Sequence, residues 1–549
     1  MIMDTSKPFH QAVVEDVAYI NEVKDSYTHH CSEYIIEDFG EEIHQLVDSV
    51  AALMSKNRLA AESGISRLYT RLYSQLYPFL LSPLPSMGLV QFNCESMGAR
   101  SFIPKGTPLI FSVKNKKENS IYRTISDCDI WDISIDDIAC LGGIGAGCQL
   151  EVELSKPVTS EGCPKELFFY INVEGDWVQS LTFQYMLLNN CIKSYVEYED
   201  GSTEELKYNV GALEELKNNK SLLNSIVRQR LYFHVPQYAS FMSCLFSKLD
   251  RPWAKAKLRF VFDCSWPDQI RVTPRLFQIN TIPVENLQVE ESDSIMVDGT
   301  VTQHIIQAPN ASSDLSIHSI EGVYAIKDVD RIPIRPSLVD LSDNSYDLNI
   351  DTHSEKYEIS FNMPGAFEDE AQVVIEALWH TPSFSQHLWQ PLSVRFHDQD
   401  FLGIVPSLPN QITKKMVPYQ KPQPISPEKA VTLAAIKNKA LLSLEDLILI
   451  LDSLGSVWKK EYAPIRRIVK NLLSSECKML NRNGKMQVGI HYRLIFDNVF
   501  EGVIPLVRDF CCRVESILNA WITSMPVKLT YQYDLMEDQK DCFQYNMDK

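Results

Sequence analysis

Residues 76–92 read LYPFLLSPLPSMGLVQF. The pattern before them is helical and the pattern after them is strand-like, so the fold changes type here. Pro78, Pro83 and Pro85 end the preceding helix, because proline lacks a backbone N–H and disfavours helix in the residue before it. Leu89 to Phe92 then form a short β-type run. We therefore expect an α+β chain with a helical N-terminal segment, β-rich middle lobes and an α/β C-terminal lobe.

Two apolar stripes with helical spacing precede this stretch. The first is Ile35/Ile36, Phe39, Ile43, Leu46/Val47, Val50 and Leu53, and the second is Ile65, Leu68/Tyr69, Leu72/Tyr73 and Leu76/Tyr77. Residues three or four apart lie on one face of a helix, so each stripe predicts one apolar face. Either the rest of this chain or the helices of a partner cover these faces, and periodicity alone does not decide between the two.

The region after residue 84 is rich in short β-type runs separated by turn residues. They are Leu89–Phe92, Leu109–Phe111, 150–154, Leu167–Val173, Leu258–Phe262, Gly322–Ile326 and Gln372–Trp379. Residues 212–223 look helical, so the region is mixed. Residues 406–427 are rich in proline with few large apolar residues, which suits a linker or an extended wrap.

The C-terminal part carries helix and strand signals of its own. Ser426-Pro427-Glu428 resembles a helix start, and Ser443-Leu444-Glu445-Asp446 resembles a capping box. Residues 488–496 alternate like a half-buried strand, and a helix follows through Leu506, Phe510, Val514, Ile517/Leu518 and Trp521. We expect domains at 1–83 (helices that bind a partner), 84–270 and 271–410 (β-rich), 411–427 (proline-rich linker) and 428–549 (α/β).

Bulk composition limits the classes of function. The chain has 549 residues, a net charge of −19, 45% hydrophobic residues and 13 cysteines. A nucleic acid partner needs a strong basic patch, and the best candidate, Lys114-Asn115-Lys116-Lys117, reads as a solvated loop. No apolar run reaches the ~18–20 residues that span a bilayer, and no secretory signal opens the chain. The cysteines form no Cys-x-x-Cys pair, so we expect reduced thiols in the cytoplasm.

Signatures of catalysis are weak. There is no phosphate-binding G-x-x-x-x-G-K-[ST], no H-E-x-x-H and no G-x-S-x-G. The glycine cluster at 142–147 does not follow a clear strand and does not open a helix, so we expect a hairpin or loop there. His29-His30-Cys31 lacks a second metal-ligating pair, and Asp127, Asp129, Asp132, Asp136 and Asp137 read as a solvated acidic face. We predict no catalytic, cofactor or metal site.

The stretch at 76–92 also carries a family resemblance. Its Leu-Tyr-Pro helix end, Pro-x-Pro-Ser-Met turn and Val-Gln-Phe strand resemble the TssF family, the baseplate subunits of bacterial type VI secretion systems. Further similar elements follow in the same order: Pro104-Lys105-Gly106-Thr107-Pro108-Leu109, Tyr122-Arg123-Thr124 with Ile130-Trp131, Asn280-Thr281-Ile282-Pro283-Val284-Glu285-Asn286-Leu287, and Phe500-Glu501-Gly502. The family's Tyr-Tyr-x-Arg-Glu-Leu opening and Asn-Arg-Asp-Leu element are missing, which marks a divergent member.

The resemblance implies a structural role without catalysis or cofactor. Two TssF-like chains would join one TssG-like chain in a wedge, and wedges would ring the spike hub, attach TssK-like adaptors and a TssE-like protein, and seed the tail tube and contractile sheath. The resemblance also implies that the protein is located in the cytoplasm, at the inner face of the bacterial inner membrane, without inserting into the membrane. We expect partner contacts from Phe39, Ile43, Tyr69, Leu72, Tyr73 and Leu76, and architectural turns at Tyr77, Pro78, Pro83, Pro85, Gly106 and Pro283.

Two other functions remain open. One is a baseplate protein of another contractile injection system, which would lack a TssG-like neighbour. The other is a β-rich glycan-acting hydrolase, which would need two buried acids in a closed pocket.

Overall fold

A computed structural model shows the architecture. It describes residues 6–30, 41–76, 80, 83–94, 101–142, 147–157, 164–173, 176–213, 225–246, 253–309, 314–327, 330–337, 343–351, 356–397, 401–409, 416–421, 426–437, 439, 441–455, 457–458, 460–480, 486–522, 525–535 and 542–546. The chain divides into two compact units, which we describe one at a time. The first contains residues 1–78 and 424–435, and the second contains residues 79–423 and 436–549.

The first unit is helical. Its long helices are α1 (Ser6–His30) and α2 (Glu41–Leu76), and α7 (Pro427–Lys437) begins in it. The sequence did not predict α1, and it predicted two helices where α2 is a single one. Residues 54–64 join the two stripes because they contain good helix formers and no proline, and Gly64 costs an exposed helix only about 1 kcal/mol. Ile35, Ile36 and Phe39 lie outside the described residues.

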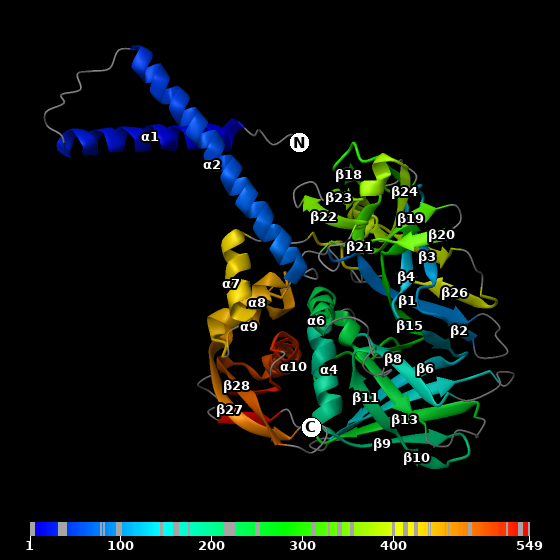
Figure 1. The fold of residues 1–549 in the computed structure, drawn as a ribbon. Helices are drawn as coiled ribbons and strands as arrows, with labels where there is room; N and C mark the ends of the chain where they lie inside the picture. Colours follow the sequence, from blue (N-terminus) through cyan, green and yellow to red (C-terminus); the bar gives the residue numbers. More distant parts are fainter. Residues whose placement is uncertain are drawn as a thin grey trace. The chain divides into compact units, whose positions relative to one another are not determined.

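A six-stranded antiparallel sheet organises the second unit (Figure 1). In spatial order its strands are β25 (Leu392–Phe396), β3 (Pro108–Val113), β4 (Asn119–Thr124), β15 (Thr281–Glu285), β1 (Met87–Cys94) and β26 (Ile404–Ser407). A two-stranded ribbon of β2 (Ser101–Ile103) and β5 (Cys128–Ile130) accompanies it. The sheet takes strands from both sides of the domain boundary that we expected at residue 270.

Two further sheets pack face to face in this unit. One has β10 (Thr203–Glu205), β9 (Cys191–Tyr198), β13 (Lys255–Phe262), β7 (Cys148–Ser155) and β6 (Ser134–Gly142); the other has β11 (Lys207–Gly211), β12 (Phe241–Leu245), β8 (Glu166–Ile171) and β14 (Phe277–Ile279). One buried cluster joins their inner faces, for example Leu258 with Phe169, and includes Phe183. On the other face of the second sheet, Tyr170 and Phe241 belong to the core of the six-stranded sheet.

Helix α4 (Trp177–Asn189) closes one side of this core, and the sequence did not predict it. Asp176 caps its start by accepting hydrogen bonds from the N–H groups of Val178 (2.9 Å) and Gln179 (3.3 Å). Its buried residues include polar and apolar side chains on several faces, so no single apolar stripe marks it in the sequence. Residues 214–223 of the predicted helix lie outside the described residues, and α6 (Ser225–His234) follows them.

The glycine cluster connects a β-hairpin. Strands β6 and β7 pair antiparallel up to Gly142 opposite Cys148, and residues 143–146 between them lie outside the described ones. The expectation that no clear strand precedes the cluster was wrong. Strand β6 was missed because a register shift between Ile135 and Asp137 breaks its alternation and because it is an edge strand with many exposed residues.

A β-sandwich is inserted between β15 and β25. One sheet contains β16 (Gln288–Glu291), β24 (Ala371–His380), β19 (Ser316–Lys327), β20 (Asp330–Pro333) and β17 (Ile295–Val297); the other contains β18 (His304–Ile305), β23 (Lys356–Asn362), β22 (Ser345–Asp351) and β21 (Arg335–Pro336). A core of its own, with Val323, Ile359 and Trp379, lies between them. Two short 3-10 helices, Pro364–Phe367 and Pro382–His387, connect its strands.

The C-terminal part is a mixed sheet with helices. Helices α8 (Leu444–Ser453) and α9 (Ala463–Ile468) lead into β27 (Val469–Leu480), β28 (Met486–Val499), α10 (Ile504–Trp521), β29 (Val527–Leu535) and β30 (Cys542–Asn546). The predicted capping box is present, because Ser443 and Asp446 each accept a hydrogen bond from the other's N–H. The strand at 488–496 and the helix after it are confirmed. Strands β29 and β30 were not predicted, and β29 pairs with β28 in parallel across α10.

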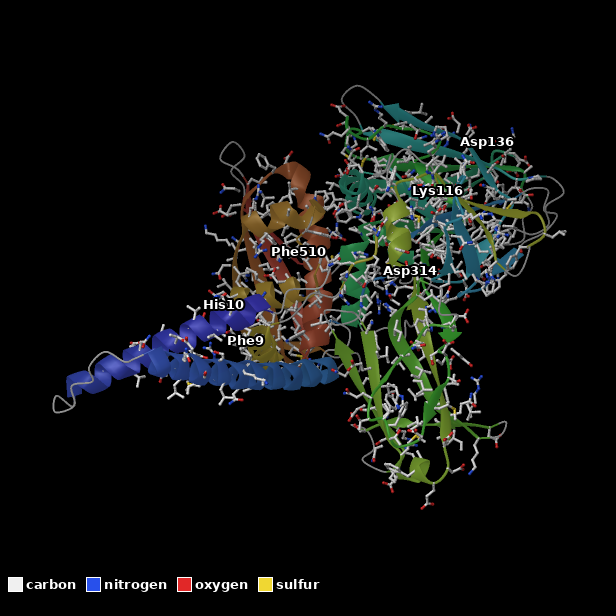
Figure 2. All side chains as sticks on the ribbon, turned by 90° about the horizontal axis from the view of Figure 1, so that it is seen from above. Phe9, His10, Lys116, Asp136, Asp314 and Phe510 are labelled. Atoms are coloured by element: carbon white, nitrogen blue, oxygen red, sulfur yellow. The ribbon has the colours of Figure 1, made fainter. Side chains whose placement is uncertain are left out.

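Helix α10 shows why the amphipathic prediction succeeded. Its predicted apolar residues are all buried, and Phe510, labelled in Figure 2, is 1% exposed and meets the rings of Trp458 and Tyr462. On the same helix Arg513 donates to both oxygens of Asp509 at 2.7 and 2.8 Å. Pairing of this kind is what allows a nearly buried arginine to be retained in a core.

Candidate protein-interaction surface

The pairing of α1 with α2 depends on small and polar residues. Ala51 and Ser55 of α2 are fully buried against α1, and the Ser55 hydroxyl donates to Asp16 at 2.6 Å. Arg58 lies 3.3 Å from both Asp16 and Glu15 and also donates to the carbonyl of Ala12. Small residues permit close approach, and the charged contacts fix the register of the two helices.

The first predicted apolar stripe is on the surface of this pair. Leu46, Val50 and Leu53 lie on successive turns of one face of α2, yet they are 62%, 43% and 60% exposed. An exposed stripe of this kind is a candidate binding surface, since soluble chains avoid contiguous exposed apolar patches. The sequence left open whether this chain or a partner covers the stripe. The structure shows that α1 does not cover these three residues.

Helix α1 adds exposed apolar residues that sequence reasoning missed. They are Phe9, Val14, Tyr19 and Val23, of which Tyr19 is 58% exposed; Figure 2 labels Phe9 on this helix. Their spacing of five, five and four residues does not follow one face of a helix, so no apolar stripe marked them in the sequence; only the lack of proline after Pro8 favours a helix in this stretch. We call the exposed apolar residues of α1 and of α2, including Met54, the hairpin surface.

The contact residues that we predicted stay predictions. Ile43, Tyr69, Leu72, Tyr73 and Leu76 lie within α2, and Phe39 lies outside the described residues.

Two of the five aspartates considered for chemistry make ordinary structural contacts, whereas Asp132, expected on a solvated face, is partly buried, which raises its pKa. Asp127 accepts the N–H of Lys105 at 2.7 Å, and Asp136 accepts hydrogen bonds from Ser134 and Ser155. Lys116 (Figure 2) lies in the exposed turn between β3 and β4, as expected. His29 and His30 end α1, and Cys31 is outside the described residues.

Within the part of the chain that the structure describes, no group of three or more His, Cys, Asp or Glu residues is arranged to hold a metal ion. No helix among the same residues is long and apolar enough to cross a membrane.

The turn at 104–109 has a clear mechanical basis. Gly106 has a φ of +85°, a left-handed conformation that glycine adopts without the cost other residues incur. The hydroxyl of Thr107 donates to the carbonyl of Pro104 at 2.7 Å, and its N–H donates to the Thr124 hydroxyl at 3.0 Å. The turn between β2 and β3 is thereby tied to the end of β4.

Arg123, next to Thr124, continues the same network. Its Nε and Nη2 both approach Glu285 Oε1, at 2.8 and 2.7 Å. Glu285 belongs to the segment 280–287, so this ion pair joins two of the sequence elements on which the resemblance rests.

The two asparagines of the 280–287 segment hold distant backbones together. Asn280, at a φ of +53°, donates from Nδ2 to the carbonyl of Trp131 at 2.8 Å and accepts that residue's N–H at 3.2 Å. Asn286, 2% exposed, donates to the Ser120 hydroxyl and the Ile121 carbonyl, both at 2.7 Å, and accepts the N–H of Thr381 at 2.9 Å. Both asparagines therefore tie the 280–287 segment to backbones distant in the sequence.

Pro283 lies between these asparagines in β15, where proline is tolerated only if its missing N–H is not needed. Its carbonyl accepts the N–H of Ile125 at 3.1 Å. The phenol of Tyr238 reaches across to the carbonyls of Val284 (2.8 Å) and Gly88 (3.2 Å) and so bridges β15 and β1.

The proline-rich segment at 406–427 pairs with the residues around Pro83 and Pro85. Pro83 and Pro85 are buried, while Tyr77 and Pro78 lie outside the described residues. Leu84 exchanges two backbone hydrogen bonds of 2.9 Å with Gln420, and Met87 exchanges two with Val417 at 3.0 and 2.7 Å. Of the two readings of residues 406–427, this pairing favours the extended wrap for residues 416–420.

The fold is α+β, with a β-rich second unit and a pair of helices that expose apolar side chains. Comparison with known proteins identifies the family. A family model described as "Type VI secretion system, TssF" matches residues 42–347, which is more than half of the chain. No curated protein matches the sequence significantly.

Two solved structures share the fold. A chain of a TssK-TssF-TssG baseplate subcomplex of the type VI secretion system, determined by cryo-electron microscopy, aligns with a TM-score of 0.73 and 13% identity over 92% of this chain and 98% of that one. A chain of the type VI secretion system baseplate complex aligns with a TM-score of 0.60 and 11% identity over 98% and 99%. The chain belongs to the TssF family of the type VI secretion system.

Proposed function

We propose that this chain is a structural subunit of a type VI secretion baseplate wedge and that its hairpin surface binds a TssG-like protein. Membership of the TssF family indicates the type VI secretion system. The similar structures are of baseplate complexes, one of which contains TssK and TssG. The observation that carries the binding proposal is the exposed stripe Leu46, Val50 and Leu53 on α2.

The further partners follow from the same role. We propose that a TssK-like adaptor attaches to the assembled wedge, with a second copy of this chain, a TssE-like protein and the spike hub completing the environment. The assembled machine would hold the chain on the cytoplasmic side of the inner membrane. A structural role of this kind requires no catalysis. It requires a rigid fold that presents binding surfaces.

The test pairs two double variants on α2. Leu46→Asp with Leu53→Asp places two carboxylates in the stripe, and Ser49→Asp with Lys56→Asp introduces the same residues at exposed positions beside it. Each full-length variant is co-expressed with the TssG-like protein, and the amount co-purified is measured beside circular dichroism. Surface substitutions usually change stability by less than about 0.5 kcal/mol, so we expect both variants to fold.

Only the stripe variant should lose its partner. Burying an unpaired carboxylate costs several kcal/mol, so co-purification should fall by at least about tenfold. A stripe variant that unfolds would show that this chain covers the stripe itself, and one that binds normally would show that the partner contacts lie elsewhere. Tyr73→Asp with Leu76→Asp, assayed in the same way, tests the other part of the predicted interface.

A further inference from the structure

Strand β27 is an open edge of the C-terminal sheet. It pairs with β28 on one side and is the terminal strand of the order β27-β28-β29-β30. Its side chains from Ser475 to Lys478 are exposed or half-buried, so this edge is accessible. Backbone groups at an open edge are available to a further strand, which can add to the sheet there.

The direction of the β27 backbone groups follows from the neighbouring strand. The N–H of Ile490 in β28 donates to the carbonyl of Pro526 at 2.9 Å, on the β29 side, so the bonding groups of Ile490 point away from β27. Ile490 lies opposite Glu476, and the two therefore form a non-hydrogen-bonded pair. The N–H and C=O of Glu476 point to the outer edge, and by alternation so do those of Ser474 and Lys478. None of these outward groups has a hydrogen-bond partner in the described part of the chain.

Two opposite charges lie two residues apart on this edge. Glu476 and Lys478 are both exposed and point to the same face of the strand, and neither forms an ion pair with a described residue. Charged side chains on an edge strand prevent indiscriminate pairing. They also restrict which strand can pair, because that strand must place a basic residue opposite Glu476 and an acidic residue opposite Lys478.

A second copy of β27 meets this requirement. When two copies pair antiparallel around a twofold axis at Cys477, Glu476 of each copy lies opposite Lys478 of the other, so the charges match twice. An axis at Glu476 or at Lys478 would place like charges opposite each other, and an axis at Ser475 would leave both charges unpaired.

One other axis, at Leu473, would also match charges, because it places Glu476 opposite Lys470. That lysine is already bonded to Asp497 at 2.8 Å, and a register shift at the start of β27 interrupts the regular strand there. The axis at Cys477 therefore fits best.

We propose that β27 binds β27 of a second copy of this chain, antiparallel and edge to edge, with the twofold axis at Cys477. The outward groups of Glu476 in one copy bond to those of Lys478 in the other, and the two four-stranded sheets become continuous. A pair this short buries little area, so it adds to the other contacts of the wedge. The inference rests on the proposed function only for the presence of a second copy in the wedge, and it names the surface through which the two copies meet.

The native cysteine on the axis makes the register measurable. Opposite residues in a non-hydrogen-bonded pair have Cα atoms about 4.5 Å apart, which a disulfide can span. The full chain is oxidised with copper phenanthroline, alone and in complex with the TssG-like protein, and mass spectrometry identifies the linked peptides. Ser475→Cys in a Cys477→Ser chain is the register control, because its two introduced thiols would lie about 13 Å apart along the strands.

Charge exchange tests the pairing itself. Glu476→Lys and Lys478→Glu each place like charges opposite one another, so each should lower cross-linking at Cys477 by at least about fivefold. The two changes together restore opposite charges and should recover the cross-link. The matched control is Glu205→Lys, at an exposed position on the edge strand β10, which should leave cross-linking unchanged.

We expect Cys477 to link two copies in the wedge and the register control to fail. If the wedge forms without this link, or if the register control links as fast as the native chain, the inference is wrong and the proposed function stands. A link from Cys477 to the TssG-like protein would also overturn it. Failure of the wedge to form would contradict the proposed function, and cross-linking of the isolated chain would then decide the inference by itself.

Discussion

Replacing Asn286 by alanine should loosen the six-stranded sheet. The wild-type side chain makes hydrogen bonds to Ser120, Ile121 and Thr381 at 2.7, 2.7 and 2.9 Å, and it is 2% exposed. Each bond contributes about 0.5–1.5 kcal/mol net, and a buried group left without a partner costs about 1–3 kcal/mol. We therefore expect a local destabilisation of about 3–4 kcal/mol.

Hydrogen exchange is the appropriate assay, because a chain with several cores does not unfold in one step and a single unfolding free energy is not defined for it. At 1.4 kcal/mol per factor of ten, the peptides covering β4 and β15 should exchange about 100- to 1,000-fold faster. The matched control is Asn349→Ala on β22, where an exposed asparagine makes one bond of 3.2 Å to Glu358. It should change exchange by no more than about threefold.

The reasoning is refuted if Asn286→Ala accelerates exchange in β4 and β15 by less than about tenfold, or no more than the control does. Asn286→Asp makes the test stricter. It keeps an acceptor for Thr381 but presents a carboxylate to the Ile121 carbonyl, so it should be at least as damaging as alanine.

Three further outcomes are expected. Gly106→Ala should cost about 1–2 kcal/mol locally because of its φ of +85°, measured by hydrogen exchange in the peptides around residues 104–109, whereas Gly502→Ala, with no such φ and no close neighbour, should leave exchange around residue 502 nearly unchanged. Burial lowers the pKa of His380 from 6.5 to about 4 and that of the neighbouring His318 to about 3, so stability should be full above about pH 6.5 and fall as the pH drops. The share of the loss that comes from His380 is on the order of 3 kcal/mol, and the curve of stability against pH should be less steep by that amount in His380→Gln. Ser443→Ala removes half of the capping box and should cost α8 about 1 kcal/mol, measured by exchange at residues 444–447; no change there would contradict the capping role.

Local periodicity predicted the elements that have one solvent-exposed face and one buried face. Helix α10 and strand β28 are examples, because each buries alternate or regularly spaced apolar residues and exposes the rest. Helix α4 was missed because it is buried on several sides, and β6 because a register shift interrupts it. The pairing of distant strands could not be predicted from local sequence. Nothing near Met87 indicates that Glu285 lies opposite it.

The candidate surface was predictable only in part. Spacing placed Leu46, Val50 and Leu53 on one face of a helix but could not show that α1 packs elsewhere, through Ala51 and Ser55. The family resemblance singled out Asn280 and Asn286 without indicating what they touch. Their contacts are with groups about 95 to 166 residues away, which a sequence pattern does not encode.

The pairing of β1 with β15 means that β1 is synthesised long before the strand with which it pairs. Strand β1 ends at Cys94, and its neighbour begins at Thr281. At about 5–20 residues per second, a ribosome needs roughly 10–40 s to make the residues between them. Throughout that interval an apolar strand, with Leu89, Val90 and Phe92 among its residues, waits for its neighbour. During that interval β1 is an aggregation risk for the nascent chain, and a slow stretch of message before Thr281 would prolong it.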